Sequence, residues 1–319
     1  MEGAVGTGAG LFTPVSAELA ALERRFREEI EADGPPMSAP MGGLFAAGGK
    51  RIRPALVLLA GQLGDPGPQH QDAAMAVEFI HAATLVHDDV IDRSKLRRGM
   101  PTVAAALGDE PAIVVGDYYF AKAYAHAAAT LDPAVVEELA AAVMRICRAE
   151  LAQHQARFRY RGTIEEYLER IEGKTAVLLA SSAWVGGRLA GLAADRLAAL
   201  CSYGTDLGLA FQIADDVLDF TAEEEQLGKP VGHDLLEGHA TLPLLLAELA
   251  EGLPEGVPAS RSEVARAVSA VRASGGPARA LDTARLHAER ARSHLASLPP
   301  GPARDCLANL AGFVVERRQ

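Results

Sequence analysis

Two segments with the same pattern constrain this 319-residue chain more than any other feature. Residues 83–92 and 210–219 each run from an apolar helical segment into the motif D-D-x-x-D, and the offset between the motifs is 215 − 88 = 127 residues. Helices that are apolar around most of their circumference belong in the centre of a bundle. Because buried carboxylates are costly, two such helices that both end in acidic motifs indicate a functional role for the acids.

Apolar residues recur at three- and four-residue spacing along most of the chain, as in amphipathic helices. We find no convincing alternating strand pattern and no Asn-Gly hairpin signal. The sequence therefore predicts an all-α, single-domain helical bundle over residues 11–319, preceded by a flexible N-terminus of residues 1–10. The expected helices cover residues 15–32, 55–63, 72–92, 111–130, 133–158, 174–189, 193–220, 242–249, 262–273, 278–298 and 302–315.

The charge and the cysteines narrow the function classes. With 31 Lys and Arg against 42 Asp and Glu, the net charge is −11, which argues against nucleic-acid binding. The three cysteines show no C-x-x-C spacing, which is typical of reduced thiols and predicts a cytoplasmic location. No run of 18 apolar residues occurs, so we expect no transmembrane segment.

The D-D-x-x-D motifs are suited to binding a divalent cation. On a helix the first and last aspartates lie one turn apart on one face, where their charges repel unless a cation binds. Hard oxygen ligands without His or Cys partners at metal-binding spacing favour Mg²⁺, which shares its remaining positions with water and phosphate. A solvated acidic helix end would explain one such motif but not two. The predicted ligands are Asp88, Asp89, Asp92, Asp215, Asp216 and Asp219.

Basic residues cluster near the first motif in spite of the acidic total. The segment Gly48-Gly49-Lys50-Arg51-Ile52-Arg53-Pro54 stands at the start of a predicted helix, where backbone N–H groups and the helix dipole attract anions. Arg97 and Arg98 follow shortly after the first motif. An ordinary basic turn would explain either cluster alone, but their position beside the acidic motif favours a site for a diphosphate.

With these motifs the chain resembles the trans-isoprenyl diphosphate synthase (polyprenyl synthetase) family. The matching segments occur in the family's order from residue 48 to residue 243. The resemblance implies a bundle of the isoprenoid synthase type around a central elongation cavity, with features like those of long-chain members. The segments are residues 48–54, 88–92, 97–99, 173–175, 211–219, 228–234 and 241–243.

The activity that the resemblance implies is condensation of isopentenyl diphosphate with an allylic diphosphate, in the order ionisation, condensation and elimination. About three Mg²⁺ ions, held chiefly by Asp88, Asp92 and Asp215, would bind the allylic diphosphate. Further contacts in that part of the site would come from Arg97, Lys174, Thr175, Gln212, Lys229 and His239. Isopentenyl diphosphate would be held by Lys50, Arg53, His81 and Arg98.

One residue departs from the family's pattern. The family usually carries a lysine two residues before the Thr-Leu-Pro segment at 241–243, and here that position is His239. Because histidine is mostly neutral at pH 7, we expect a weaker or pH-dependent contact with the diphosphate. The change concerns the rate and not the class of reaction.

Small residues before the first motif predict a long product. Ala83 and Thr84 lie about one turn before Asp88, where an aromatic side chain would block the growing chain. We therefore expect a product longer than farnesyl. Tyr119, on the next helix, is a candidate for a deeper floor that would stop the chain earlier, and a farnesyl or geranylgeranyl product is the alternative.

Three other functions fit parts of the sequence. A class I terpene cyclase would lack residues 48–54 and the second Asp motif, and an HD-type phosphohydrolase needs more histidines than the pairs at 87–88 and 233–234. A non-catalytic partner subunit of a heteromeric prenyl synthase predicts no turnover by the chain alone. The resemblance implies a homodimer, and the insolubility of a long product leaves peripheral membrane contact open.

Overall fold

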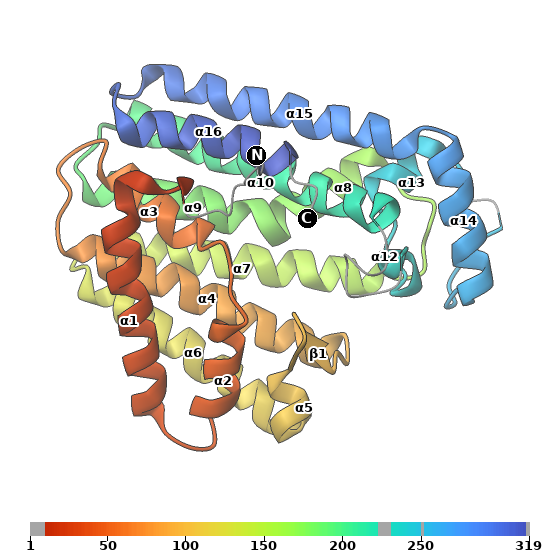
Figure 1. Ribbon diagram of the computed structural model, residues 1–319, viewed down its shortest axis with the longest axis horizontal. Helices are drawn as coiled ribbons and strands as arrows, with labels where there is room; N and C mark the ends of the chain where they lie inside the picture. The colour runs from red at the N-terminus through yellow and green to blue at the C-terminus, as the bar shows by residue number, and fades with distance from the viewer. Residues whose placement is uncertain (1–9, 223–230, 250–251, 317–319) are drawn as a thin grey trace, which may run out of the picture. The chain divides into compact units, whose positions relative to one another are not determined.

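The computed structural model describes residues 10–222, 231–249 and 252–316, and it consists almost entirely of helices (Figure 1). The predicted all-α fold is confirmed. The elements up to α6 are η2 (Thr13–Val15), α1 (Ser16–Asp33), α2 (Ser38–Ala46), α3 (Ile52–Gly61), α4 (Gln69–Ile91), β1 (Leu96–Arg97), β2 (Met100–Pro101), α5 (Val103–Leu107) and α6 (Asp109–Ala129). The remainder are α7 (Pro133–Gln155), α8 (Ile164–Ile171), η3 (Glu172–Ala176), α9 (Val177–Leu189), α10 (Ala194–Thr221), α12 (His233–Leu236), α13 (Leu242–Ala247), α14 (Arg261–Ala273), α15 (Gly276–His294), η4 (Leu295–Ser297) and α16 (Pro302–Glu316).

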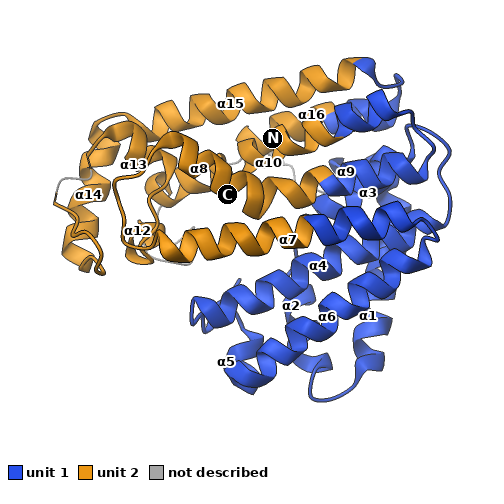
Figure 2. Ribbon diagram, turned by 180° about the vertical axis from the view of Figure 1, so that it is seen from behind, with its two compact units in different colours: residues 1–141, 181–200, 297–307 blue, residues 142–180, 201–296, 308–319 orange. Residues whose placement is uncertain are grey.

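The chain divides into two compact units, which Figure 2 colours separately. Each unit is assembled from three separate segments, so no single linker in the sequence marks the division. The predicted extent of the domain, residues 11–319, stays a prediction. Unit 1 consists of residues 1–141, 181–200 and 297–307, and unit 2 of residues 142–180, 201–296 and 308–319.

Unit 1 is organised around α4, which is buried along most of its length and packs against α6 (Figure 1). The His87 ring of α4 packs against Gly116 of α6, where an added Cβ would lie 2.1 Å from Nε2 of that ring. One turn before Ala83, the buried ring of Phe79 lies 5.5 Å from that of Tyr119 and 5.3 Å from that of Phe26. The helix that carries the first Asp motif is therefore anchored along most of its length in the core of unit 1.

A short antiparallel ribbon follows α4 and was not predicted. Its strands β1 and β2 pair Leu96 with Pro101 and Arg97 with Met100, which leaves a two-residue turn. Both turn residues have positive φ, 51° at Arg98 and 78° at Gly99, as in a type I′ hairpin turn. Strands of two residues are too short to show alternation, so the sequence pattern could not reveal them.

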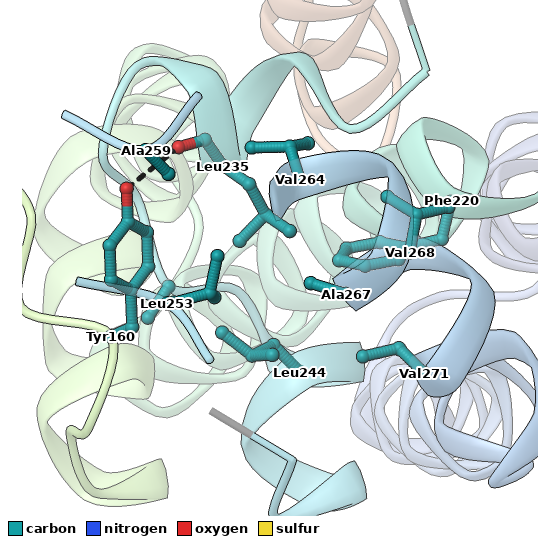
Figure 3. Close-up of a cluster of buried hydrophobic side chains, with 11 residues drawn as sticks. Tyr160, Phe220, Leu235, Leu244, Leu253, Ala259, Val264, Ala267, Val268 and Val271 are labelled. Atoms are coloured by element: carbon teal, nitrogen blue, oxygen red, sulfur yellow. Dashed lines mark hydrogen bonds between the residues drawn. The ribbon is translucent and has the colours of Figure 1, made fainter. Parts of the chain in front are cut away.

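Unit 2 contains a hydrophobic cluster at the end of α10, the helix that carries the second Asp motif (Figure 3). Phe220 is fully buried in this cluster, next to side chains from α13 and α14. The hydroxyl of Tyr160 donates a 3.0 Å hydrogen bond to the carbonyl of Leu235 in α12. These contacts fix the end of α10 directly after Asp219.

Four short helices were not predicted, namely α2, α5, α8 and α12. Helix α8 does carry a readable signal, because Thr163 and Glu166 form a capping box at its start. Helix α2 contains Pro40, Gly42 and Gly43, which ordinarily indicate a break. Its short length left too few apolar positions to show periodicity.

Helix α10 is the one described helix that is long and apolar enough to cross a membrane by length and composition. Of its apolar window, 56% is buried inside the protein. The core helix of a soluble protein passes the same test. The expected absence of a membrane span therefore stays a prediction.

The close approach of α9 to α3 gives a test of this packing. A Cβ added at Gly186 would lie 2.1 Å from the carbonyl oxygen of Val57, and backbone cannot move aside as a side chain can. We expect Gly186→Ala to lower the free energy of unfolding by about 1–3 kcal/mol, measured by urea denaturation. Gly42→Ala is the control, because it has open space in α2 and should raise stability by about 0.5–1 kcal/mol. Equal effects of the two changes would contradict the packing.

Candidate active site

The first Asp motif lies at the C-terminal end of α4. Asp88 and Asp92 are half-buried and one turn apart, and the N–H of Asp92 donates to the carbonyl of Asp88 at 2.8 Å. Asp89 points elsewhere and is only 2% exposed. The guanidinium of Arg97 holds it through Nε, at 3.0 and 3.1 Å, and through Nη2, at 2.9 Å. The ribbon thus returns Arg97 to the motif that precedes it.

The ion pair between Arg97 and Asp89 distinguishes Asp89 from the other two aspartates of the motif. Burial raises the pKa of Asp89, and Arg97 opposes this rise. Asp89 therefore already has a counter-ion within the protein. Asp88 and Asp92 are the carboxylates of this motif whose partial exposure suits contact with a cation.

The Gly-Gly-Lys-Arg segment turns Arg51 into the protein. Arg51 has a left-handed backbone, with φ of 47°, at the N-terminal boundary of α3. Its guanidinium binds the buried carboxylate of Glu78 at 2.7 Å and also contacts Glu23 and the carbonyl of Phe45, which lies 3.1 Å away. Arg51 is therefore a structural residue and leaves ligand binding to its neighbours.

The remaining cations of unit 1 gather around His81. Burial lowers the pKa of Arg53, whose Nε atom is buried without a hydrogen-bond partner. The guanidinium of Arg98 lies against Gly49, since a Cβ there would be 3.3 Å from Nη1. Burial holds the pKa of His81 well below its usual value, and nearby arginines lower it further. These arginines are, in order of effect, Arg53, Arg98, Arg97 and Arg51.

This arrangement fits an anion. Guanidinium groups that lower one another's pKa repel, and an orphaned donor such as Nε of Arg53 gains a partner when an anion binds. Lys50, at an exposed position directly before α3, belongs to the same segment. The structure thus brings Arg53, His81 and Arg98 together, and their role in binding isopentenyl diphosphate stays a prediction.

The predicted chain-length residues occupy three environments. Ala83 is fully buried in α4, and Thr84 is half-buried with its hydroxyl on the carbonyl of His81 at 2.8 Å. Tyr119 is fully buried, and its hydroxyl donates to Asp33 of α1 at 2.8 Å. The ring of Tyr119 is therefore held in the aromatic cluster around Phe79, a residue that sequence reasoning missed.

In unit 2 a π-helical turn, η3, positions Lys174 and Thr175. Such turns interrupt the regular ladder and occur often at functional sites. Gly208 of α10 permits close approach, because a Cβ there would lie 2.4 Å from the Cα of Ala176. Lys174 forms an ion pair with Glu150 of α7. Glu150 thus fixes the position of the Lys174 ammonium group.

A chain of hydrogen bonds links this turn to the second Asp motif. Thr175 donates to Oε1 of Gln212 at 2.8 Å, and Nε2 of Gln212 donates to Asp216 at 2.8 Å. The other oxygen of Asp216 accepts from Tyr167 of α8 at 2.7 Å. Burial, with a further effect of Asp234, raises the pKa of Asp216 to about 8. The chain fixes the orientation of the Gln212 amide and occupies both oxygens of Asp216.

Asp219 is also engaged by the protein. It is 2% exposed, and its two oxygens accept from the backbone N–H groups of His233 and Asp234 at 3.2 and 3.1 Å. This contact holds the start of α12 against Asp219. Asp215 is half-buried and is the motif residue that most resembles Asp88 and Asp92 in exposure.

His239 lies in a positively charged environment. Burial lowers its pKa to about 3, and the charges of Arg170, Lys174 and Arg157 add to this effect. The imidazole is therefore neutral at pH 7, and its expected contact with a diphosphate stays a prediction. The prediction for Lys229 lies outside the described residues.

The carboxylates fit a hard divalent cation. Among the described residues no group of three His, Cys, Asp or Glu side chains is already close enough to hold a metal. Carboxylates without such a cage suit Mg²⁺, which retains waters and takes further oxygens from phosphate. The residues suited to contact with such a cation are Asp88 and Asp92 in unit 1 and, separately, Asp215 in unit 2.

Sequence reasoning did not find the residues that support the site. Glu78 holds Arg51, and Tyr167 holds Asp216. A signal for Glu78 was present, because an acid within an otherwise apolar stretch of α4, three residues before His81, needs a cationic partner. Tyr167 gave no signal of its own.

Comparison with known proteins is consistent across sequence and structure. The heptaprenyl diphosphate synthase component 2 of Geobacillus stearothermophilus is 37% identical over 313 residues, which cover 96% of this chain and 98% of that protein. The short chain isoprenyl diphosphate synthase of Methanothermobacter thermautotrophicus is 38% identical, over 92% of this chain and 95% of that one. The crystal structure of a Caulobacter crescentus polyprenyl synthase, complexed with calcium and isoprenyl diphosphate, has 37% identity and a TM-score of 0.90 and covers all of both chains.

The family model described as polyprenyl synthetase matches residues 35–255, which include both Asp motifs and the cation cluster around His81. That range is more than half of the chain. Together with the full-length relatives, it shows that this chain belongs to the polyprenyl synthetase family.

Proposed function

We propose that this chain is a Mg²⁺-dependent trans-prenyltransferase that condenses isopentenyl diphosphate with an allylic diphosphate to give a polyprenyl diphosphate longer than farnesyl. The observation that carries the proposal is that Arg53, His81 and Arg98 lie close together, in a chain that also has two Asp motifs. Within this cluster, Nε of Arg53 is buried and has no hydrogen-bond partner. One diphosphate needs direct cationic contacts, and the other needs carboxylates with a metal.

Isopentenyl diphosphate would bind to the cation cluster. Arg53 and Arg98 present guanidinium donors suited to phosphate oxygens, and Lys50 adds a point charge. Because His81 is neutral, it donates or accepts one hydrogen bond without adding charge. This half of the site binds and orients the nucleophile and does not take part in bond breaking.

The allylic diphosphate would be held through the Asp motifs. Asp88, Asp92 and Asp215 would hold Mg²⁺, which when bound neutralises the diphosphate and makes it a better leaving group. Lys174 adds a cation at the π-helical turn. The bond between the allylic carbon and oxygen breaks with its electron pair on the diphosphate, and the double bond of isopentenyl diphosphate forms the new carbon–carbon bond. A proton then leaves, and the departing diphosphate is the base that accepts it.

Gln212 and Thr175 would face the developing positive charge. Their hydrogen-bond chain to Asp216 and Tyr167 fixes both dipoles before the substrate arrives. Preorganised dipoles stabilise a developing charge without the cost of reorientation. His239 would contribute a neutral contact in place of the lysine that the family usually carries.

The product length is proposed from the small residues before the first motif. Ala83 and Thr84 are small, so their side chains would not block an apolar chain that grew beside them, and the aromatic cluster around Phe79 lies one turn before Ala83 in α4. The relative named as a heptaprenyl diphosphate synthase component supports a long product. The relative named as a short chain synthase supports the farnesyl or geranylgeranyl alternative.

We propose a homodimer formed through α6. Val114, Ile113 and Tyr118 on this helix are 65%, 46% and 39% exposed, although all are large apolar or aromatic residues. Val114 and Tyr118 are four residues apart and share one face of the helix, and Ile113 adjoins Val114. The alternative is a partner subunit in a heteromeric synthase. The word component in the name of one relative supports this alternative. A cytoplasmic location, supported by three cysteines without C-x-x-C spacing, is part of the same proposal.

The first prediction concerns the metal ligands. Asp215→Asn removes one charge from the proposed Mg²⁺ site, so kcat should fall at least about 100-fold. Asp195→Asn is the control, because this exposed residue lies on the same helix and undergoes the same chemical change. The measurement is diphosphate release by the purified chain supplied with Mg²⁺ and both substrates. No turnover by the wild-type chain alone would favour the partner-subunit alternative.

The second prediction concerns Glu78. In Glu78→Gln, Arg51 loses its buried counter-charge, so the free energy of unfolding should fall by about 3 kcal/mol. The displaced guanidinium would then disturb Arg53 and Arg98, and KM for isopentenyl diphosphate should rise about tenfold while KM for the allylic substrate stays unchanged. Glu23→Gln, whose side chain is 37% exposed, should have a much smaller effect. Equal changes in both KM values would argue against a positioning role.

The third prediction concerns product length. Replacing Ala83 with Ser, Leu and Phe should shorten the product progressively, because each larger side chain removes space from the path of the growing chain. Chromatography that separates products by carbon number gives the readout, and thermal melting shows that each variant is folded. A folded Ala83→Phe variant with unchanged products would refute this path.

A further inference from the structure

Unit 2 contains a second place where cations gather, at a cavity whose lining includes Tyr167 and Arg170 of the site described above. A cavity of about 530 Å³ is lined by α7, by the segment that follows it and by α8. We call it the arginine pocket. Its basic lining consists of Arg145, Arg148, Arg159, Arg161 and Arg170.

The charges of the arginine pocket are not balanced from within. Three glutamates line it, so the lining carries 5 − 3 = +2 in a chain whose total is −11. Glu172 is already paired with Arg145 at 2.7 Å, and Glu166 accepts from the N–H of Thr163 at 2.9 Å. Arg148 and Arg159 have no carboxylate partner within 4.0 Å among the residues that the structure describes. They are the cations with which an anion would pair.

The wall of the pocket is apolar. Ala149 and Ala152 lie on one face of α7, Ala156 directly follows that helix, and Leu245 of α13 lines the same cavity. A small inorganic anion would make no use of such a wall. The combination of apolar wall and guanidinium groups instead suits an amphiphilic anion, in which a diphosphate is joined to a hydrocarbon body.

Arg170 connects the pocket with the second Asp motif. It lines the pocket, donates to the carbonyl of Ala240 at 2.7 Å and lies 5.4 Å from the ring centre of Tyr167. Tyr167 in turn donates to Asp216. An anion that draws Arg170 toward the pocket would therefore disturb the support of Asp216. Gly173, directly before Lys174, also borders the pocket.

We propose that the arginine pocket is a regulatory site for a prenyl diphosphate, and that its occupation slows turnover through Arg170 and Tyr167. The choice of a prenyl diphosphate as the ligand rests on the proposed function. The presence of the pocket and its preference for an amphiphilic anion do not.

The binding test uses the full chain without Mg²⁺. Calorimetry with farnesyl S-thiolodiphosphate, a diphosphate that is not turned over, should show about one equivalent less bound by the double variant Arg148→Glu with Arg159→Glu than by wild type. The control is Arg279→Glu with Arg290→Glu, two exposed residues on α15 that give the same change in net charge. It should bind as wild type does.

Three results would overturn the pocket as described. Equal stoichiometry in the pocket variant and wild type would show that nothing binds there, and equal loss in the control would show that only net charge matters. Inorganic pyrophosphate that fills the same equivalent as tightly as the thiolodiphosphate would show that the apolar wall plays no part. Because these measurements need no catalysis, they stand apart from any failure of the proposed activity.

A kinetic measurement tests the regulatory part. With Mg²⁺ present, excess allylic diphosphate should inhibit wild type and the α15 control, and the pocket variant should lose at least about half of this inhibition. Inhibition of equal size in the pocket variant would overturn the regulatory role and leave only a binding site.

Discussion

Holding like charges close together is the constraint on which both parts of the candidate site depend. Arg53 and Arg98 approach each other near His81, and Asp88 and Asp92 share one face of α4. Such groups repel, so folding must supply opposing contacts as long as no ligand does. In unit 1, Glu78 provides the opposing charge, and it does so from the same helix that carries the first Asp motif. Binding and folding are therefore coupled in this region.

The two Asp motifs differ in the contacts that stabilise their buried carboxylates. In the first, Asp89 is paired with the cation Arg97. In the second, Asp216 and Asp219 are held by neutral donors, from side chains in one case and from the backbone in the other. Aspartates of the same motif thus have two different structural roles. Some aspartates fix the local backbone, and the half-buried ones remain suited to a cation.

The fold was largely predictable because long helices repeat the apolar spacing many times. Short elements such as α2 and the ribbon β1–β2 do not, so they depend on turn geometry and tertiary packing that no periodicity reveals. In the site, residue types and spacing identified the aspartates and the cation cluster. They could not show that Arg51 turns inward or that Tyr167 supports Asp216, because these contacts join residues that are 27 and 49 positions apart.

The exchange of lysine for His239 also follows from charge. Lys174, Arg157 and Arg170 already act on this position, and their combined effect with burial lowers the pKa of His239 to about 3. A lysine here would add another cation to a region where a buried guanidinium or ammonium is already costly. A neutral imidazole avoids that repulsion in the absence of a ligand and, under the proposed function, would keep a hydrogen-bonding group for a phosphate oxygen. On that proposal the chain would give up part of its attraction for the diphosphate in return for a more stable unliganded site, and the remaining cations would supply the rest of the attraction.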